Sequence, residues 1–336
     1  MSETKRIMYL DIARGIAIIS VIIGHYIQLV SLQYVNVIYC FHMPLFFLIS
    51  GTFIKKNVSV DKLFEKKSKQ LLRPYLLVST IWALGVAGKN FLQDGTEACI
   101  EQFLKSCHAI FIGGGQSIRM LWFLLALFWG SIFTQIVLFI TKKKIQFVAV
   151  LLISVIGYLS SSIVVVPWNI QQGMVATSYL YIGYILKNGN WIERIYKNKK
   201  YAAILSVVSV AIWVIVARNS LMEMWCNRFK YGFIDWGAAI LVSYIIMLFA
   251  LFLSNSNVNS IKKLAAWFGI NSMYLFSVHY LDYRWFGFIV LKFVKIKNYM
   301  LQTVLVILIT LVLYCSLVQC ILIFKNFKKD RMISKI

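Results

Sequence analysis

The sequence predicts an all-α integral membrane protein, a single bundle of about ten transmembrane helices. Of its 336 residues, 60% are hydrophobic and only 14% are charged, and the mean hydropathy is +0.75. A soluble domain carries about 25% charged residues. Apolar runs of about 20 residues, enough to cross roughly 30 Å of hydrocarbon, recur from end to end. No linker or soluble extension separates these runs, so we expect one domain over residues 1–336.

Ten apolar runs are expected to span the membrane. In chain order they lie at approximately residues 7–30, 37–54, 71–88, 118–140, 145–166, 170–187, 200–218, 233–253, 264–281 and 299–324. The first run lacks a small-residue cleavage site, which favours a retained helix over a signal peptide. We see no internal repeat and no broken helix among the ten runs.

The basic residues set the expected orientation. With ten spans, the segments on the side of the N-terminus hold 24 Lys and Arg residues, and the segments on the opposite side hold 10. Lys and Arg are enriched in cytoplasmic loops. We therefore expect both termini in the cytoplasm, in a multi-pass protein of the cell membrane. Because the net charge of +23 is spread between the apolar runs, it indicates topology and not nucleic-acid binding.

The first run carries three residues that hydrocarbon disfavours, Asp11, Arg14 and His25. A charged side chain inside a membrane helix is costly unless it is paired or hydrated, so such residues indicate a functional site. Helical spacing puts Arg14 and His25 on one face, roughly 16 Å apart. Asp11 lies three residues before Arg14 on the same face, where the two charges can neutralise each other.

The four histidines all fall in the extracytoplasmic half of the expected topology. They are His25, His42, His108 and His279. An imidazole titrates near neutral pH, so a group of histidines near one surface suits proton transfer. The alternative stays open that each histidine is a hydrogen-bonded packing residue.

A basic stretch, DKLFEKKSKQLLRPY, lies at residues 61–75 on the expected cytoplasmic side. Its cations, among them Lys69 and Arg73, are candidates to bind phosphate groups. Basic residues beside a membrane also bind anionic lipid headgroups, and this is the alternative explanation. No Cys-x-x-Cys or His-x-x-x-His pattern occurs, so we predict no metal site.

Polar residues or a tryptophan interrupt three other apolar segments, FHMPLFFLISGT, LWFLLALF and GINSMYLFSVHYL. The glycine of the first segment allows close helix packing, which by itself explains the motif. The tryptophan of the second is typical of an aromatic belt. Polar residues eight positions apart in the third share a helix face, which normally turns towards the bundle or a hydrated cavity. The candidate binding residues of these segments are His42, Ser50, Trp122, Asn271, Ser272 and His279.

Together these motifs resemble the acyltransferase-3 family of integral membrane acyltransferases, in particular its fucose 4-O-acetylase-like branch. The stretch Asp11–Gly15, followed by His25, is similar to the family signature of an arginine and a histidine separated by ten residues. The three interrupted segments resemble the second-helix, fourth-helix and late-helix motifs, so the resemblance covers the whole chain. Many members carry an Arg-x-x-Arg pair before the proline that corresponds to Pro74, whereas this chain has three lysines and Arg73 there.

The resemblance implies transfer of an acyl group, usually acetyl, from cytoplasmic acyl-CoA to a hydroxyl of a carbohydrate. Acetyl-CoA or another acyl-CoA is then a donor substrate, and we expect no permanently bound cofactor. Arg14, with Asp11 beside it and the basic inner stretch, would hold the CoA phosphates. His25 would act as general base on the acceptor hydroxyl, with a covalent acyl-histidine as a variant. His42 and His279 would orient the acceptor or stabilise the oxyanion.

Two other classes of function remain open at the level of sequence. One is a transporter or flippase for a lipid-linked sugar or small solute, with the charged residues of the first run as a coupling relay. The other is a non-catalytic membrane partner of a glycan-assembly complex. The sequence also leaves open the acceptor, a polysaccharide or a lipid-linked glycan among membrane lipids, the identity of the acyl group and the number of subunits.

Overall fold

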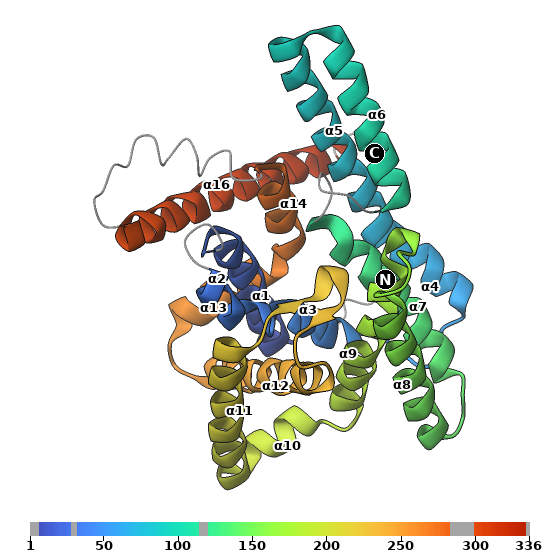
Figure 1. The fold of residues 1–336 in the computed structure, drawn as a ribbon. Coiled ribbons are helices and arrows are strands. Elements are labelled where there is room, and N and C mark those ends of the chain that lie inside the picture. The colour runs from blue at the N-terminus through green and yellow to red at the C-terminus, as the bar shows by residue number, and fades with distance from the viewer. Residues whose placement is uncertain (1–6, 28–31, 114–119, 283–298, 334–336) are drawn as a thin grey trace.

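The chain is built almost entirely from helices (Figure 1). The computed structural model describes residues 7–27, 32–113, 120–282 and 299–333. In chain order the helices and strands are α1 (Met8–Ile27), α2 (Leu32–Tyr39), α3 (His42–Gly51), α4 (Val60–Lys67), α5 (Arg73–Asp94), α6 (Thr96–Ile112), α7 (Trp122–Leu138), α8 (Lys143–Ser160), α9 (Ile170–Asn188), α10 (Trp191–Lys197), α11 (Lys199–Asn219), β1 (Met222–Glu223), β2 (Arg228–Phe229), α12 (Phe233–Asn255), α13 (Asn259–Ile270), α14 (Ser272–Asp282) and α16 (Tyr299–Ile333). A π-helical turn, Ser68–Leu72, joins α4 to α5, and β1 and β2 pair as a short antiparallel ribbon.

Six helical segments within the described residues are long and apolar enough to cross a membrane. They are Met8–Ile27, Val60–Asp94, Lys143–Ser160, Lys199–Asn219, Phe233–Asn255 and Leu301–Phe327. Two shorter apolar helices, Val35–Gly51 and Trp122–Leu138, coincide with the second and fourth expected runs. The structure is that of an all-α membrane protein, as the sequence predicts. The count of ten crossings and the cytoplasmic location of the termini stay predictions.

The ninth expected run, residues 264–281, is not a single helix. Asn271 separates α13 from α14, and its backbone leaves the helical region at φ −99° and ψ 13°. Its side-chain amide donates to the carbonyl of Trp267 at 2.9 Å. An Asn side chain that bonds the backbone in this way competes with continuation of a helix. The expectation that no helix is broken was therefore wrong for this run.

Many apolar side chains on the outer helices have no protein neighbour to cover them. Leu84 on α5, Val207 on α11 and Val312 on α16 are 57%, 71% and 65% exposed. Soluble proteins rarely expose large apolar surfaces of this kind. These helices thus present the faces that a lipid bilayer would cover.

Helix α1 lies near the centre of the bundle, in contact with α3, α12, α13, α14 and α16 (Figure 1). Its packing against α13 depends on two glycines. A Cβ atom on Gly15 would lie 2.0 Å from the carbonyl oxygen of Ala265, and one on Gly269 would lie 1.8 Å from that of Asp11. Small residues let two helix backbones touch, as in membrane helix pairs generally. This contact fixes the position of Asp11 and Arg14 along the helix axis relative to α13.

Helices α3 and α9 meet through a second pair of glycines. A Cβ atom on Gly51 would lie 2.0 Å from the carbonyl oxygen of Leu180, and one on Gly183 would lie 2.0 Å from that of Leu48. The glycine of the Ser50-Gly51 motif therefore serves close helix packing, as its sequence predicts. Ser50 itself lies at the edge of this contact, on the cavity described below.

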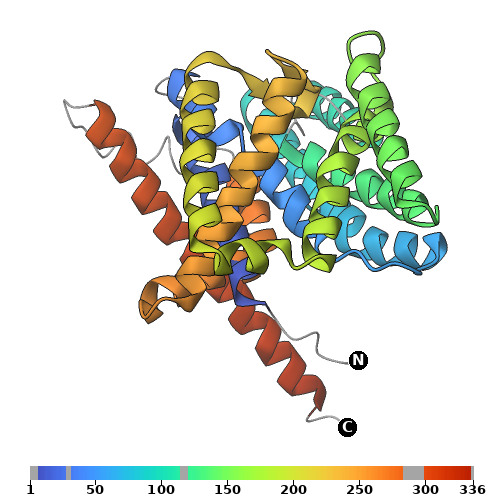
Figure 2. The same ribbon diagram turned by 90° about the horizontal axis from the view of Figure 1, so that it is seen from below.

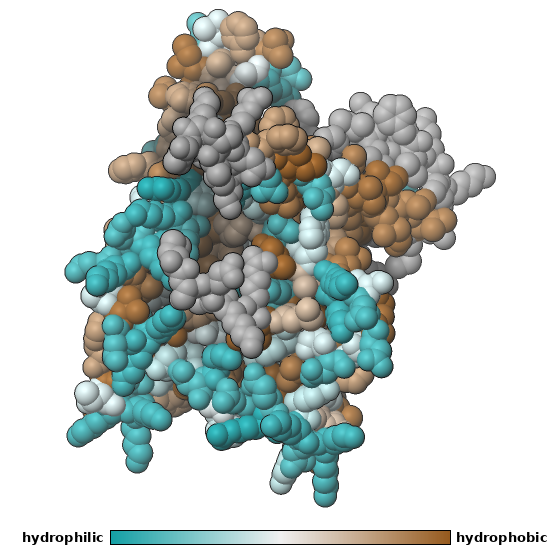
Figure 3. Space-filling model, turned by 180° about the vertical axis from the view of Figure 1, so that it is seen from behind, coloured by the Kyte–Doolittle hydropathy of each residue, from teal (hydrophilic) through white to brown (hydrophobic). Residues whose placement is uncertain are grey.

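One end of the bundle is polar. Seen from below, the first turns of α1, the end of α16, α4, α10 and the α12–α13 connection lie towards the same edge (Figure 2). Figure 3 views the molecule from this side, and hydrophilic side chains cover much of the lower half of that face. The opposite edge in Figure 2 carries the end of α1, α2 and the β1–β2 ribbon. This end of the bundle therefore has a polar surface.

Candidate active site

A cavity of about 590 Å³ opens beside the first turns of α1. Residues of α1, α3, α4, α7 and α14, together with the π-helical turn and the segment after α3, line it. Its polar lining residues are Asp11, Arg14, Ser50, Lys55, Lys66, Lys67, Gln70, Gln135 and Ser272. Four of these side chains are cationic and one is acidic, so the polar part of the cavity suits an anion.

Arg14 is anchored on two sides. Its Nη1 lies 3.6 Å from Oδ1 of Asp11, one turn earlier in α1. Its guanidinium also lies 5.3 Å from the ring centroid of Phe53, over the face of the ring. A planar guanidinium held in this way can present its remaining donors to a phosphate in two-point geometry. Asp11 also lies near the N-terminus of α1, where the helix dipole favours a negative charge.

Two of the lysines that line the cavity, Lys66 and Lys67, come from the end of α4. Leu63, Lys66, Lys67, Gln70 and Leu71 all line the cavity, at the three- and four-residue spacing of one helix face. Lys69 lies off this face and is exposed, where its ammonium pairs with the carboxylate of Glu65. The basic stretch thus contributes Lys66 and Lys67 to the cationic lining, beside Arg14 and Lys55.

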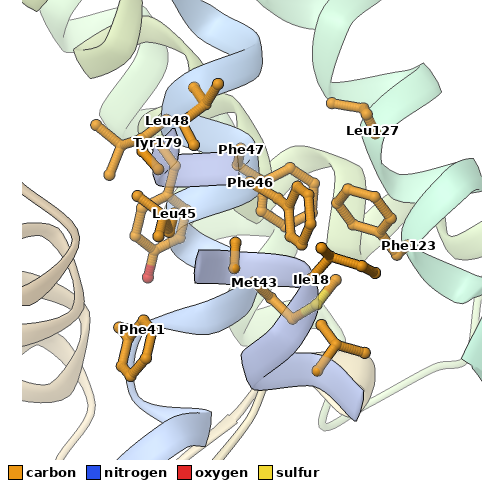
Figure 4. Packing of buried hydrophobic residues seen from close by; sticks show 14 of the residues in the cluster. Ile18, Phe41, Met43, Leu45, Phe46, Phe47, Leu48, Phe123, Leu127 and Tyr179 are labelled. Carbon is orange, nitrogen blue, oxygen red and sulfur yellow. The ribbon is translucent and has the colours of Figure 1, made fainter. Parts of the chain in front are cut away.

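The middle of the cavity is apolar. Phe46 of α3 and Phe123 of α7 face each other with ring centroids 5.4 Å apart, and Ile18, Met43 and Leu127 lie around them (Figure 4). The ring of Phe276 from α14 lies 6.2 Å from that of Phe123. A slim, weakly polar chain fits such a wall better than a charged group does.

The far end of the cavity approaches three histidines. Val21 lines the cavity, and His25 lies one turn later in α1. Met43 and Phe276 also line it, and they lie next to His42 in α3 and one turn before His279 in α14. Each of these three helices therefore carries a histidine just beyond the end of the cavity.

The histidines form one cluster together with Tyr39. The ring centroid of His25 lies 5.3 Å from that of His279 and 6.5 Å from that of Tyr39. Tyr39 in turn lies 5.0 Å from His42. His42 is buried, and its Nδ1 lies 3.0 Å from the carbonyl oxygen of Ile38. Since a carbonyl can only accept, Nδ1 of His42 carries the proton.

A buried carboxylate completes the cluster. The hydroxyl of Tyr314 donates to Oδ2 of Asp282, and the hydroxyl of Tyr26 donates to the same oxygen at 3.4 Å. Nδ1 of His279 lies 3.3 Å from the hydroxyl of Tyr314. His279, Asp282 and Tyr314 are all buried, so this chain of contacts is shielded from water.

The structure brings together most of the residues that the sequence singles out. Asp11, Arg14, Ser50 and Ser272 line the cavity. The remaining predicted residues lie away from its lining: Lys69 and Arg73 are exposed, Asn271 bonds its own helix end, and Trp122 lies against Phe47 with ring centroids 6.2 Å apart. His25, His42 and His279 form the cluster at the far end, while His108 is exposed on α6.

Several residues of the site escaped the sequence argument. Lys55, Gln70 and Gln135 line the cavity, and Tyr26, Tyr39, Asp282 and Tyr314 lie in or beside the histidine cluster. The sequence could have pointed to Asp282, because this residue follows His279 by three positions and so shares its helix face. Among the described residues, no three His, Cys, Asp or Glu side chains group as a metal site.

Comparison with known proteins identifies the chain. The profile of the acyltransferase-3 family, described as "Acyltransferase domain", matches residues 7–319. The Nodulation protein NolL of Mesorhizobium japonicum is 38% identical over a stretch that covers 24% of this chain and 25% of that protein. The match therefore spans about a quarter of the length of that relative. No solved structure matches. The family match covers the cavity and all three clustered histidines, and the chain therefore belongs to the acyltransferase-3 family of membrane acyltransferases.

Proposed function

We propose that the protein is an O-acyltransferase that moves an acyl group, in the first place acetyl, from cytoplasmic acyl-CoA to a hydroxyl of an exported or cell-surface carbohydrate. One observation carries the proposal. A single cavity has a cationic lining at the polar end of the bundle and reaches to within one helical turn of His25. Arg14, Lys66 and Lys67 supply charges for the phosphates of CoA. The apolar middle suits the pantetheine arm.

The proposed orientation follows from the same arrangement. In this proposal the polar end faces the cytoplasm, where acyl-CoA is made. Helix α1 then runs across the membrane from the donor-binding end to the site of the reaction. Arg14 and His25 are eleven residues apart in this unbroken helix, about 16 Å at 1.5 Å per residue. A pantetheine arm is long enough to cover that distance. This orientation places both termini in the cytoplasm of a protein with about ten crossings.

The proposed reaction is a direct transfer with His25 as general base. A nitrogen of the His25 ring takes the proton of the acceptor hydroxyl while the hydroxyl oxygen attacks the thioester carbonyl. The carbon–sulfur bond then breaks, and the ring returns the proton to the departing CoA sulfur. The products are the ester and CoA with a free thiol, and His25 is neutral again. His42 and His279, which lie around His25, are placed to bind the acceptor.

Purified protein in proteoliposomes provides the test. We expect radiolabel from [acetyl-¹⁴C]acetyl-CoA to appear on an added methyl glycoside, with one free CoA thiol released per ester formed. A transporter or a non-catalytic partner releases no CoA thiol in response to the glycoside. The absence of acceptor-dependent CoA release across a panel of methyl glycosides and extracted surface polysaccharide contradicts the proposed function.

Two lysines two positions apart test the donor end of the cavity. Lys67 lines the cavity and Lys69 does not. We expect Lys67→Gln to raise the Kd of acetyl-CoA about tenfold, because a charged hydrogen bond contributes roughly 1.5–3 kcal/mol. Lys69→Gln, which disrupts only an exposed pair, is expected to change the Kd by less than about twofold. Equilibrium dialysis at two salt concentrations measures both. Salt should weaken binding to the wild type more than to Lys67→Gln, and equal Kd values for the two variants contradict this donor site.

A further inference from the structure

The carboxylate of Asp282 determines where the protons of the cluster lie. A carboxylate only accepts hydrogen bonds, and it receives one from each of two phenols, Tyr26 and Tyr314. Tyr314 has a single proton, which it donates to Asp282. The oxygen of Tyr314 can then only accept from His279. Nδ1 of His279, 3.3 Å away, therefore carries a hydrogen, and Nε2 is the basic nitrogen of that ring.

The ring of His279 packs against the neighbouring imidazole of His25. The ring centroids of His25 and His279 lie 5.3 Å apart, with the planes at 37°. Tyr314 holds the ring of His279 in one orientation, and the ring of His25 packs against that ring. The contact therefore limits the orientations open to His25. A general base needs one fixed orientation towards the hydroxyl that it deprotonates.

We propose that Asp282 and Tyr314 are positioning residues, which fix the tautomer of His279 and, through the contact of its ring, the orientation of His25. This inference rests on the proposed role of His25 as base. In nucleophilic and general-base sites a third group commonly orients the base in this way. Here the support comes from three elements, since α1 carries His25, α14 carries His279 and Asp282, and α16 carries Tyr314. Neither Asp282 nor Tyr314 lines the donor cavity.

Isosteric substitutions separate positioning from packing. Tyr314→Phe removes one hydroxyl and Asp282→Asn removes one charge, with little change of volume. We expect each variant to lower kcat for acetyl transfer to the methyl glycoside about 10- to 100-fold, the loss typical when the partner that orients a histidine is removed. The Kd of acetyl-CoA should stay at the wild-type value. Tyr75→Phe is the matched control, because Tyr75 is equally buried and its hydroxyl donates to the carbonyl of Ile110 at 2.8 Å, in a different hydrogen bond.

The path through His279 is tested by combination. In a His279→Ala background, adding Tyr314→Phe should lower kcat no further, because residues that act through one another are not additive. Wild-type kcat in both Tyr314→Phe and Asp282→Asn overturns the inference. So does a full additional loss in the double variant, and so does an equal loss in Tyr75→Phe.

A spectroscopic measurement keeps the inference independent of the enzyme assay. Nitrogen NMR of ¹⁵N-histidine-labelled protein in lipid distinguishes the two neutral tautomers, and the His279 signals are assigned as those lost in His279→Gln. We expect the Nδ1–H tautomer in the wild type and its partial or complete loss in Tyr314→Phe. The same tautomer in both proteins overturns the inference. If the wild type transfers no acetyl group at all, the proposed function fails, while the tautomer measurement still decides the arrangement of Asp282, Tyr314 and His279.

Discussion

His25→Ala is expected to lower acyl transfer from acetyl-CoA by about 10²- to 10⁴-fold, the usual contribution of a general base. The imidazole is half-buried beside His279 and Tyr39, one turn beyond the last cavity residue of α1. An alanine there removes the base but leaves the cationic lining of the donor end, where Arg14 lies about three turns earlier in α1. The expected pattern is therefore a lost kcat with an unchanged Kd for acetyl-CoA. Initial rates in proteoliposomes and equilibrium dialysis measure the two quantities.

His108→Ala is the control for this variant. His108 is exposed on α6 and lies outside the histidine cluster. Its replacement should leave both kcat and the melting temperature at their wild-type values. If His25→Ala retains more than about a tenth of the wild-type kcat, His25 is not the base. If its melting temperature falls sharply, His25→Gln, which keeps more of the side-chain volume, provides the second comparison.

The spacing of the three polar residues along α1 was predictable because all three lie within one helix. Asp11, Arg14 and His25 are fixed relative to one another by a rise of 1.5 Å per residue, and the unbroken helix keeps that spacing. The same argument fails for the basic stretch. Helical periodicity groups the residues of this stretch into faces but does not tell which face turns towards the cavity. Lys66 and Lys67 lie on the face that does, whereas Lys69 and Arg73, which the sequence analysis names, are exposed.

The histidine cluster shows the second limit of prediction from sequence. His25 and His279 share a predicted side of the membrane, but their contact depends on how α14 packs on α1. Tyr314 lies in an apolar run, and only the packing of α16 reveals its hydrogen bond to Asp282. Contacts between helices that are distant in sequence follow from side-chain packing, which hydropathy does not encode.

The contact between α1 and α13 yields the second large effect. Gly269→Ala adds one methyl group, which would lie 1.8 Å from the carbonyl oxygen of Asp11. The neighbouring atoms are helix backbone and cannot rotate away, so the two helices must separate. Overpacking of this kind costs about 1–3 kcal/mol or more. We expect a clearly lower melting temperature in detergent and a reduced yield of folded protein, with the same result for Gly15→Ala.

Gly85→Ala and Gly88→Ala on α5 separate this clash from the ordinary effect of replacing a glycine. A Cβ atom on either residue would meet nothing within 4 Å. Since alanine favours a helix over glycine by roughly 0.5–1 kcal/mol, these two variants should be as stable as the wild type or slightly more stable. A Gly269→Ala protein that matches them in melting temperature would show that α1 and α13 do not touch as the structure has them. Separation of these helices also shifts Asp11 and Arg14, so a Gly269→Ala protein that still folds should bind acetyl-CoA more weakly, whereas the α5 variants should not.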